Sequence, residues 1–463
     1  MLRVTVLERG RVERGTSDDP DEVMGGRPSR CILPRRLYDR FKKFEADQVV
    51  EGERRIVDWR NGYGIVGQWV GVIQIPGLQL EILPKIDGQE PAGQDESADA
   101  YVGDVRDNLV FMLARGGLVS VRARGIADLG LRRGSLYDQL VNAFLDRTQM
   151  ELGRGYDREY TAEEGNLLSL RGKLLISQQV TKNAAQRHRF FCRHDVLTEA
   201  TIICMRLKQA CHVLRNRALS PVLTTKVQTV LALLDEVPDV AYRPGEPSPT
   251  FTRQNDRFRE IYTFACMVLE GQAANAKRGS ASTFSLLFNM DQVFERFIAE
   301  FVKSDVELLV PEAKVVAQGK GDRLHLFRDL GSKESRVLNL KPDLLVAHQE
   351  SRLVVDTKWK RLSPKKNVRP DDGDLYQLYA YLQRYECKNA YLLYPGGEGL
   401  APRTLEALHK HAGVGVGNVG VRFVDMKRSL RDPHGRSELA KQLAEILREG
   451  LGLPNSVAVQ GLT

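Results

Sequence analysis

Hydrophobic and polar positions divide this chain into three stretches of different periodicity. In residues 1–95, β-branched and apolar residues alternate with polar ones, and Pro76 and Gly77 separate two alternating runs. A period of two predicts strands, and a Pro-Gly pair between such runs predicts a hairpin turn. A short helix is expected at 35–44. We therefore predict a β-rich N-terminal domain over residues 1–95.

The middle of the chain has a helical pattern. Apolar residues recur three and four positions apart, which predicts amphipathic helices at 108–114, 135–152, 195–216 and 254–271. The polar and acidic segment 87–106 is typical of a linker or surface loop. We therefore predict a mainly helical domain over residues 107–280.

From residue 281 the pattern becomes mixed. Short apolar runs predict strands near Val315, His325, Leu344 and Val354, and further strands at 390–394 and 421–425. Helices are expected at 289–302, 374–385 and 437–449. The prediction is an α/β domain over 281–451, followed by a flexible tail over 452–463. The fold class expected for the whole chain is multidomain α+β.

Composition narrows the class of protein only moderately. The chain has 463 residues, of which 42% are hydrophobic and 28% charged, and a net charge of +8. A mildly basic chain tolerates a polyanionic partner without requiring one. The six cysteines show no Cys-x-x-Cys spacing, which indicates buried thiols in a reducing compartment. Without a signal sequence or a membrane-length apolar run, we expect a cytoplasmic protein that does not enter membranes.

Candidate chemistry gathers at the ends of two predicted strands. Asp343 precedes one apolar strand, and Asp356 and Lys358 end the next. Because residues two apart in a strand share a face, Asp356 and Lys358 should point the same way. Carboxylates suit a hard divalent cation such as Mg²⁺, and a lysine can offset charge that gathers at phosphorus. This combination predicts metal-dependent phosphodiester hydrolysis.

The spacing alone is weak, because an Asp-x-Lys triplet also describes a strand end with a surface salt bridge. The neighbouring helices strengthen it. Gln377 and Tyr381 lie four residues apart on one face of a predicted helix, and Glu295 on the preceding helix supplies a further carboxylate. These surroundings favour a catalytic site over a solvated strand end.

Three motifs resemble the PD-(D/E)xK nuclease superfamily, in a branch with a RecB-like helix. They are Pro342-Asp343, Asp356-Thr357-Lys358 and Gln377-x-x-x-Tyr381. The resemblance implies that Asp343 and Asp356 bind the metal and that Lys358 is the catalytic lysine. It further implies that Glu295 is an additional acidic metal ligand, and that Gln377 and Tyr381 steady the site or the DNA backbone. The expected metal is Mg²⁺, with Mn²⁺ as the alternative.

Other segments are similar to McrC-type proteins. They are the Pro-Lys hairpin at 71–86 and the segments 153–156, 170–173, 192–195 and 289–295. This resemblance implies the nuclease subunit of a modification-dependent restriction system acting on double-stranded DNA. The implied partner is an McrB-like AAA+ ring that hydrolyses GTP, on which residues 1–95 would dock.

Three sequence features bear on whether this chain binds nucleotide or DNA. The chain lacks a Gly-x-x-x-x-Gly-Lys-Ser/Thr loop, so we expect it to bind no nucleotide itself. A glycine-rich stretch at 413–420 precedes a predicted strand, which favours a flexible connector. A basic run is predicted to contact DNA phosphates; it comprises Lys358, Lys360, Arg361, Lys365, Lys366 and Arg369.

Two other functions remain open at this stage. A stand-alone RecB-like DNA nuclease would share the site but need no partner. A non-catalytic adaptor would regulate an AAA+ ring through a decayed nuclease fold, although the intact Asp343, Asp356 and Lys358 argue against decay. Cleavage without nucleotide would indicate the former, and stimulation of the ring without cleavage the latter.

Overall fold

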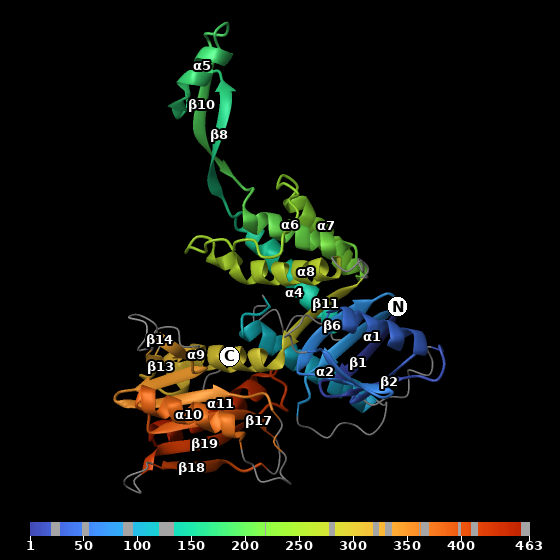
Figure 1. The fold of residues 1–463 in the computed structure, drawn as a ribbon, viewed down its shortest axis with the longest axis vertical. Coiled ribbons are helices and arrows are strands. Elements are labelled where there is room, and N and C mark those ends of the chain that lie inside the picture. The colour runs from blue at the N-terminus through green and yellow to red at the C-terminus, as the bar shows by residue number, and fades with distance from the viewer. Residues whose placement is uncertain are drawn as a thin grey trace. The chain divides into compact units, whose positions relative to one another are not determined.

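The chain forms two compact units. A computed structural model describes residues 1–19, 28–48, 55–86, 96–119, 134–217, 219–276, 283–317, 324–328, 336–360, 362, 370–396, 400–408 and 415–454. One unit contains Met1–Leu140 with Ala274–Thr463, and the other is Val141–Ala273. Figure 1 shows the fold, coloured from blue at the N-terminus to red at the C-terminus.

The N-terminal part of the first unit is β-rich, as predicted. Its elements are β1 (Leu2–Leu7), β2 (Arg11–Arg14), β3 (Arg30–Leu33), α1 (Arg35–Gln48), β4 (Val57–Arg60), β5 (Tyr63–Val66), β6 (Trp69–Ile75), β7 (Leu78–Leu83) and α2 (Glu96–Arg115). The predicted hairpin is confirmed, because β6 and β7 pair antiparallel around Pro76 and Gly77. Gly77 has a φ of 87°, which a glycine adopts without strain.

Two sheets share the core of this part. One has the order β1-β7-β6-β11, where β11 is Phe284–Asn289, and the other has the order β3-β2-β5-β4. The predicted helix begins at Arg35 and extends to Gln48. Its Tyr38 packs edge-on against Trp59 at 5.4 Å between ring centroids. These aromatic rings close the core over the strands.

Part of the predicted linker at 87–106 is wrong. The helix α2 begins at Glu96, so its first turns lie where a loop was expected, while residues 87–95 lie outside the described part. Residues 96–105 are mostly acidic or small, a composition typical of a loop. The buried apolar residues of the helix lie in its later turns. Local composition therefore gave the wrong boundary, because packing of the later turns decides where the helix begins.

The second unit combines helices with a protruding β-arm. Its elements are α4 (Leu136–Gly153, beginning in the first unit), β8 (Glu159–Leu167), β9 (Lys173–Leu174), α5 (Ile176–Lys182), β10 (Phe190–Thr198), α6 (Ile202–Arg215), α7 (Pro221–Leu233), the 3-10 helix η2 (Asp256–Phe258) and α8 (Arg259–Ala276). Strands β8 and β10 pair antiparallel over their full length. Figure 1 shows them, with α5, extending away from the helices of their own unit. We call residues 159–198 the arm.

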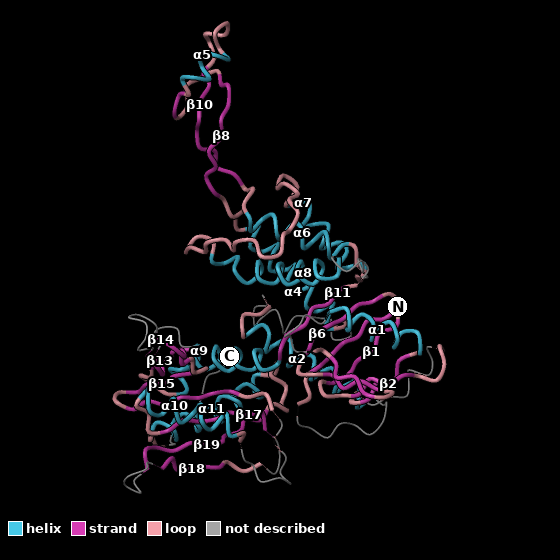
Figure 2. The backbone as a smooth tube through the Cα atoms, in the orientation of Figure 1, coloured by secondary structure: helices cyan, strands magenta, loops and turns pink. Residues whose placement is uncertain are grey.

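The arm adds strands to the segment that was predicted to be mainly helical. The helix expected from residue 195 begins at Ile202, because 195–198 belong to β10. Most residues of β8 are exposed on both faces, so the alternation of apolar and polar positions that marks a half-buried strand is missing. Figure 2 shows strand, helix and loop following one another along the arm.

The C-terminal part of the first unit is mixed α/β, as predicted. Its elements are α9 (Met290–Leu309), β12 (Lys314–Ala317), β13 (Leu324–Arg328), β14 (Arg336–Leu340), β15 (Leu344–His348), β16 (Ser351–Thr357), α10 (Asp372–Tyr385), β17 (Asn389–Gly396), β18 (Arg403–Leu408), β19 (Gly415–Asp425) and α11 (Pro433–Leu451). The main sheet has the order β12-β15-β16-β17-β19-β18, and β13 pairs separately with β14. The glycine-rich residues 415–420, expected as a connector, form the start of β19.

Helices cover both faces of the main sheet. Side chains of α10, including Leu378 and Leu382, pack in one core with Val354 and Leu392. The neighbouring position Leu353 faces α11, where a Cβ on Gly450 would come within 2.5 Å of its side chain. Since alternate residues of a strand point to opposite faces, α10 and α11 lie on opposite sides. Asp356 has the parity of Val354 and therefore lies on the α10 side.

The predicted domain boundaries stay predictions, and the compact units run differently. Strand β11 lies within the α/β domain predicted over 281–451, but it pairs antiparallel with β6 of the N-terminal sheet. Cys31, Cys192, Cys204, Cys211 and Cys387 are buried, and no described cysteine forms a disulfide. No helix in the described part is long and apolar enough to cross a membrane.

Candidate active site

Asp343 and Asp356 face each other across adjacent strands. Strands β15 and β16 are antiparallel with Leu344 opposite Val355, and continuing this register places Asp343 opposite Asp356. Asp356 is only 2% exposed. The amide and the hydroxyl of Thr357 both donate to Asp343 Oδ2, each at 2.7 Å. The hairpin therefore brings the two carboxylates together. Thr357, the neighbour of Asp356, holds the carboxylate of Asp343.

Lys358 lies against this pair. Its Nζ is 2.7 Å from Asp356 Oδ2 and 3.7 Å from Asp374 Oδ1. Its amide donates to the carbonyl of Leu393 on β17 at 2.9 Å, so strand pairing extends to the lysine itself. The backbone thus fixes the ammonium on the side predicted from the two-residue spacing.

Helix α10 supports the site through Gln377 and Tyr381. Gln377 Nε2 lies 3.5 Å from Asp356 Oδ1 and donates to the Tyr381 hydroxyl at 2.8 Å. That hydroxyl donates to the carbonyl of Lys341 at 3.1 Å, two residues before Asp343. Tyr381 is 2% exposed, so these hydrogen bonds lie in the protein interior beside the two aspartates. The contacts connect Gln377 and Tyr381 to the segment around the two aspartates, and the role of this pair in the site stays a prediction.

Burial and crowding perturb the charges here. Burial, then the charges of Asp356 and Glu295, raise the pKa of Asp343 to about 8, against the hydrogen bonds from Thr357. Burial also raises the pKa of Asp356, although Lys358 opposes it. Burial lowers the pKa of Lys358, but Asp356 and Asp374 outweigh it and the pKa ends above its usual value. Lys358 is therefore an ammonium at neutral pH.

The donor set fits a hard divalent cation held by few protein ligands. Among the described residues, no three His, Cys, Asp or Glu side chains are grouped so as to hold a metal ion. Glu295 on α9 acts on Asp343 through its charge, and its role as a ligand stays a prediction. Mg²⁺ commonly binds through one or two carboxylates and keeps several waters. Asp343 and Asp356 could hold such an ion, whose charge would relieve their repulsion.

Asp374 belongs to the site but was not predicted from the sequence. This carboxylate contacts Lys358 and, at 3.2 Å, Lys360. It precedes Gln377 by three residues, a spacing that puts both on one helix face, and this signal could have revealed it. Of the predicted DNA-contacting run, Lys360 is also paired with Asp371 at 2.6 Å. Arg361, Lys365, Lys366 and Arg369 lie outside the described residues.

Asp343→Asn is expected to stabilise the metal-free protein at alkaline pH. The pKa of Asp343 is about 8 in the folded state against 3.8 ordinarily, so the unfolded chain loses its proton first as pH rises. The free energy of unfolding of the wild type therefore falls progressively as the pH rises between those two values. The total loss above pH 8 is on the order of a few kcal/mol. Thermal unfolding of both proteins from pH 4 to pH 9 measures this, and the variant's advantage should vanish near pH 4.

Added Mg²⁺ provides the control for this prediction. It should raise the melting temperature of the wild type and narrow the difference, because a bound cation stabilises the ionised pair. Equal melting temperatures of the wild type and Asp343→Asn at pH 9 without the cation would contradict the proposed crowding at Asp343.

A family model matches residues 65–395 of the chain, and its description is "McrBC 5-methylcytosine restriction system component". The matched segment runs from β5 through the hairpin, the arm and the paired aspartates to the end of β17. It therefore includes all six predicted site residues.

The fold is similar to solved structures from Thermococcus gammatolerans. A chain from the assembly of McrB AAA+ hexamers with bound McrC matches with a TM-score of 0.62 at 17% identity, covering 96% of this chain and 99% of that one. A chain of the McrBC complex from the same organism has a TM-score of 0.47 at 19% identity, over 66% of this chain and 88% of that one. At these identities the first match shows a shared fold.

A curated relative matches a shorter segment. It is the tRNA-guanine(15) transglycosylase of Methanopyrus kandleri, 36% identical over 90 residues. The match covers 18% of this chain and 19% of that enzyme, so the chain spans about a fifth of its length.

Proposed function

The chain belongs to the family of McrBC 5-methylcytosine restriction system components, as a subunit of the McrC type, and on that premise we propose that it cuts DNA. The proposed reaction is hydrolysis of phosphodiester bonds in double-stranded DNA. The proposed partner is an McrB-like AAA+ ring that hydrolyses GTP and whose GTPase this chain stimulates.

The opposed pair Asp343 and Asp356, with Lys358 against it, carries the proposal. A divalent cation bound there would polarise a phosphoryl oxygen and lower the pKa of a water molecule. Lys358 is charged at neutral pH and lies where negative charge would gather at a bound phosphate. Thr357 and Gln377 keep the two carboxylates oriented. The chain's own contribution is thus positioning and charge.

The arm is the proposed surface for the ring. Large apolar side chains are exposed along it, namely Tyr160, Leu168, Leu170, Ile176, Val180 and Leu197. An exposed apolar group of this kind commonly marks a site of protein association. The similar structure from Thermococcus gammatolerans holds McrB hexamers with bound McrC. We assign the arm to such a ring because no residue of α5 is buried within its own chain.

The N-terminal hairpin offers less surface. Every residue of β7 is buried, and β6 is buried except for Trp69. These strands are central in their sheet, so their side chains build the core of the β domain. Docking of residues 1–95 on the partner stays a prediction, and it would have to use other elements of that domain.

Reconstitution tests the proposed function. The full chain, its genomically neighbouring AAA+ GTPase, GTP and Mg²⁺ are incubated with plasmid that carries 5-methylcytosine. We expect linearised plasmid only when all components are present, because this chain holds the cutting site and the partner the nucleotide site. Gel analysis with each component omitted in turn measures this dependence.

Two outcomes would replace the proposal. Cleavage by the chain alone without nucleotide would make it a stand-alone nuclease. A faster partner GTPase, without cleavage and without Mg²⁺ binding by calorimetry, would make it an adaptor.

A further inference from the structure

A buried carboxylate of the N-terminal domain contacts the residue after Lys358. Glu8, directly after β1, is 2% exposed, and its Oε1 accepts from Trp359 Nε1 at 2.6 Å. The amide of Lys85 donates to the same oxygen at 3.3 Å. Trp359 is itself 3% exposed. A hydrogen bond from the indole to this carboxyl group is strong and directional in such a dry place.

Trp359 also contacts the helix that begins beside this junction. Its ring lies 5.3 Å from that of Phe294, which immediately precedes Glu295 on α9. The Trp359 indole thus contacts Phe294, the neighbour of the predicted metal ligand Glu295. Trp359 itself directly follows the predicted catalytic residue Lys358 in the chain. Contacts that hold Trp359 therefore also restrict the backbone segment that carries Lys358.

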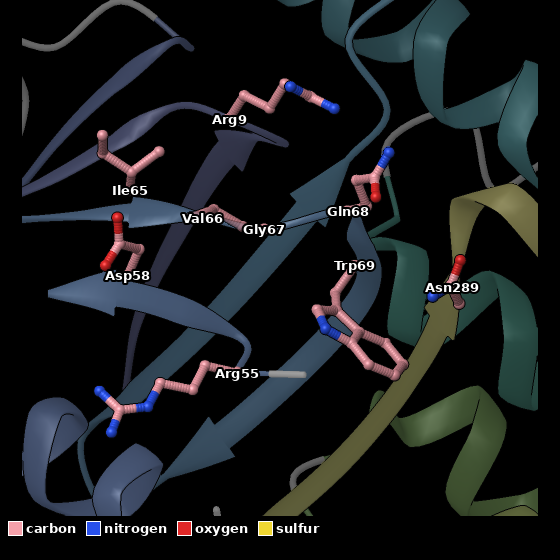
Figure 3. A pocket seen from close by; sticks show the side chains of 9 residues that line it. All are labelled: Arg9, Arg55, Asp58, Ile65, Val66, Gly67, Gln68, Trp69 and Asn289. Atoms are coloured by element: carbon pink, nitrogen blue, oxygen red, sulfur yellow. The ribbon is translucent and has the colours of Figure 1, made fainter. Parts of the chain in front are cut away.

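A second contact to Trp359 is less enclosed. Gln68 Nε2 donates to the Trp359 carbonyl at 3.0 Å, and the Gln68 carbonyl accepts from the Met290 amide at 2.9 Å. Gln68 also lines a cavity of about 380 Å³, together with Trp69 and Asn289. Figure 3 shows these three side chains among those that line the cavity. Glu8 is thus enclosed by protein, whereas Gln68 borders this cavity.

Glu8 is an expensive residue for a purely structural role. Among the described residues, its Oε2 is buried and has no hydrogen-bond partner. Burial raises the pKa of Glu8 to about 7, while the bonds from Trp359 and Lys85 oppose that rise. An apolar side chain would fill the space at lower cost, but it would leave the buried Trp359 indole without an acceptor. The cost of burying Glu8 is therefore tied to its contact with Trp359.

We propose that Glu8 is a positioning residue for DNA cleavage, which holds Trp359 and through it the backbone segment that carries Lys358. The N-terminal β domain thereby becomes part of the catalytic machinery, not merely a neighbour of it. This inference rests on the proposed nuclease function. Its geometric basis is the continuous path from Glu8 through the Trp359 indole to the adjacent residue Lys358.

Three variants of the full chain test the link. Glu8→Ala removes the acceptor, whereas Glu8→Gln keeps an oxygen for the indole. Glu45→Ala is the matched control, because Glu45 is also 2% exposed and accepts from an indole, Trp59 Nε1 at 2.9 Å, at a place without a catalytic neighbour. Each is assayed with the ring, GTP, Mg²⁺ and methylated plasmid for kcat, KM and stimulated GTPase.

We expect Glu8→Ala to lower kcat by roughly 10- to 100-fold, with little change in KM or GTPase, because misplacing a catalytic group affects the chemical step. Glu8→Gln should remain within about threefold of wild type, as a retained acceptor preserves the geometry. Glu45→Ala should retain kcat. Wild-type kcat in Glu8→Ala, or an equal loss in Glu45→Ala, would overturn the inference.

Hydrogen exchange supplies a readout that does not depend on activity. Glu8→Ala should increase exchange at the Lys358 and Trp359 amides, while Glu8→Gln and Glu45→Ala should not. Unchanged exchange there would refute the link even if cleavage fell. Conversely, a wild type that never cuts DNA, with the expected exchange pattern, would remove the nuclease function and leave only the mechanical connection.

Discussion

Asp356→Asn is expected to reduce DNA cleavage by at least about 10³-fold while GTP hydrolysis by the partner stays stimulated. Asp356 lies opposite Asp343, contacts Lys358 at 2.7 Å and lies 3.5 Å from Gln377. The amide keeps the shape of the side chain but loses the charge that would bind a cation. Plasmid cleavage and GTPase are measured on the same reconstituted complex.

Lys358→Met is the matched variant, because it leaves both aspartates and removes only the ammonium. We expect it to lose cleavage as well, while Mg²⁺ binding persists in calorimetry and is lost in Asp356→Asn. The lysine now neutralises part of the site, so its removal should not weaken cation binding. Substantial cleavage by Asp356→Asn would dismiss this pair as the catalytic centre.

The triple variant of the arm with Leu168→Ser, Leu170→Ser and Ile176→Ser is expected to bind the AAA+ ring at least about 100-fold more weakly than the wild type. These side chains are 72%, 57% and 71% exposed, so the substitutions remove no buried contact of the chain itself. A few apolar anchors usually carry most of the energy of an interface, about 2 kcal/mol or more for the strongest. Affinity measured by light scattering or interferometry tests this, with melting temperature unchanged.

Val222→Ser on α7 is the control for the arm. Val222 is 62% exposed in the same unit but outside the arm. It should bind the ring like wild type. If the arm variant kept wild-type affinity and full GTPase stimulation, the ring would dock elsewhere, and the N-terminal domain would become the first place to search.

The site illustrates what pattern alone can predict. Asp343, Asp356 and Lys358 lie at ends of short apolar strands, and a strand's period of two places Asp356 and Lys358 on one side without further information. The four-residue spacing of Gln377 and Tyr381 did the same on α10, where the two are hydrogen-bonded. Local periodicity suffices for such pairs because the backbone geometry of one element determines them.

Prediction failed where burial is unusual. Most residues of β8 are exposed, so this strand carries no hydrophobic alternation to detect, and the helix predicted at 195–216 wrongly included residues 195–198 of β10. Strand β11 looks like the entry to the C-terminal domain, yet it pairs with β6 more than 200 residues earlier. Such pairing depends on which strand edge is available, which no local window contains.

The sequence by itself determined the alternation of the N-terminal strands, the hairpin turn at Gly77 and the residue types at the candidate site. Those features depend on steric preferences and periodicities of neighbouring residues. Only the tertiary structure decided that Asp343 faces Asp356, that Asp374 contacts Lys358, and that Glu8 accepts from Trp359 across 351 positions. These contacts depend on which surfaces become buried together, and burial strengthens the electrostatic interactions and hydrogen bonds within such contacts.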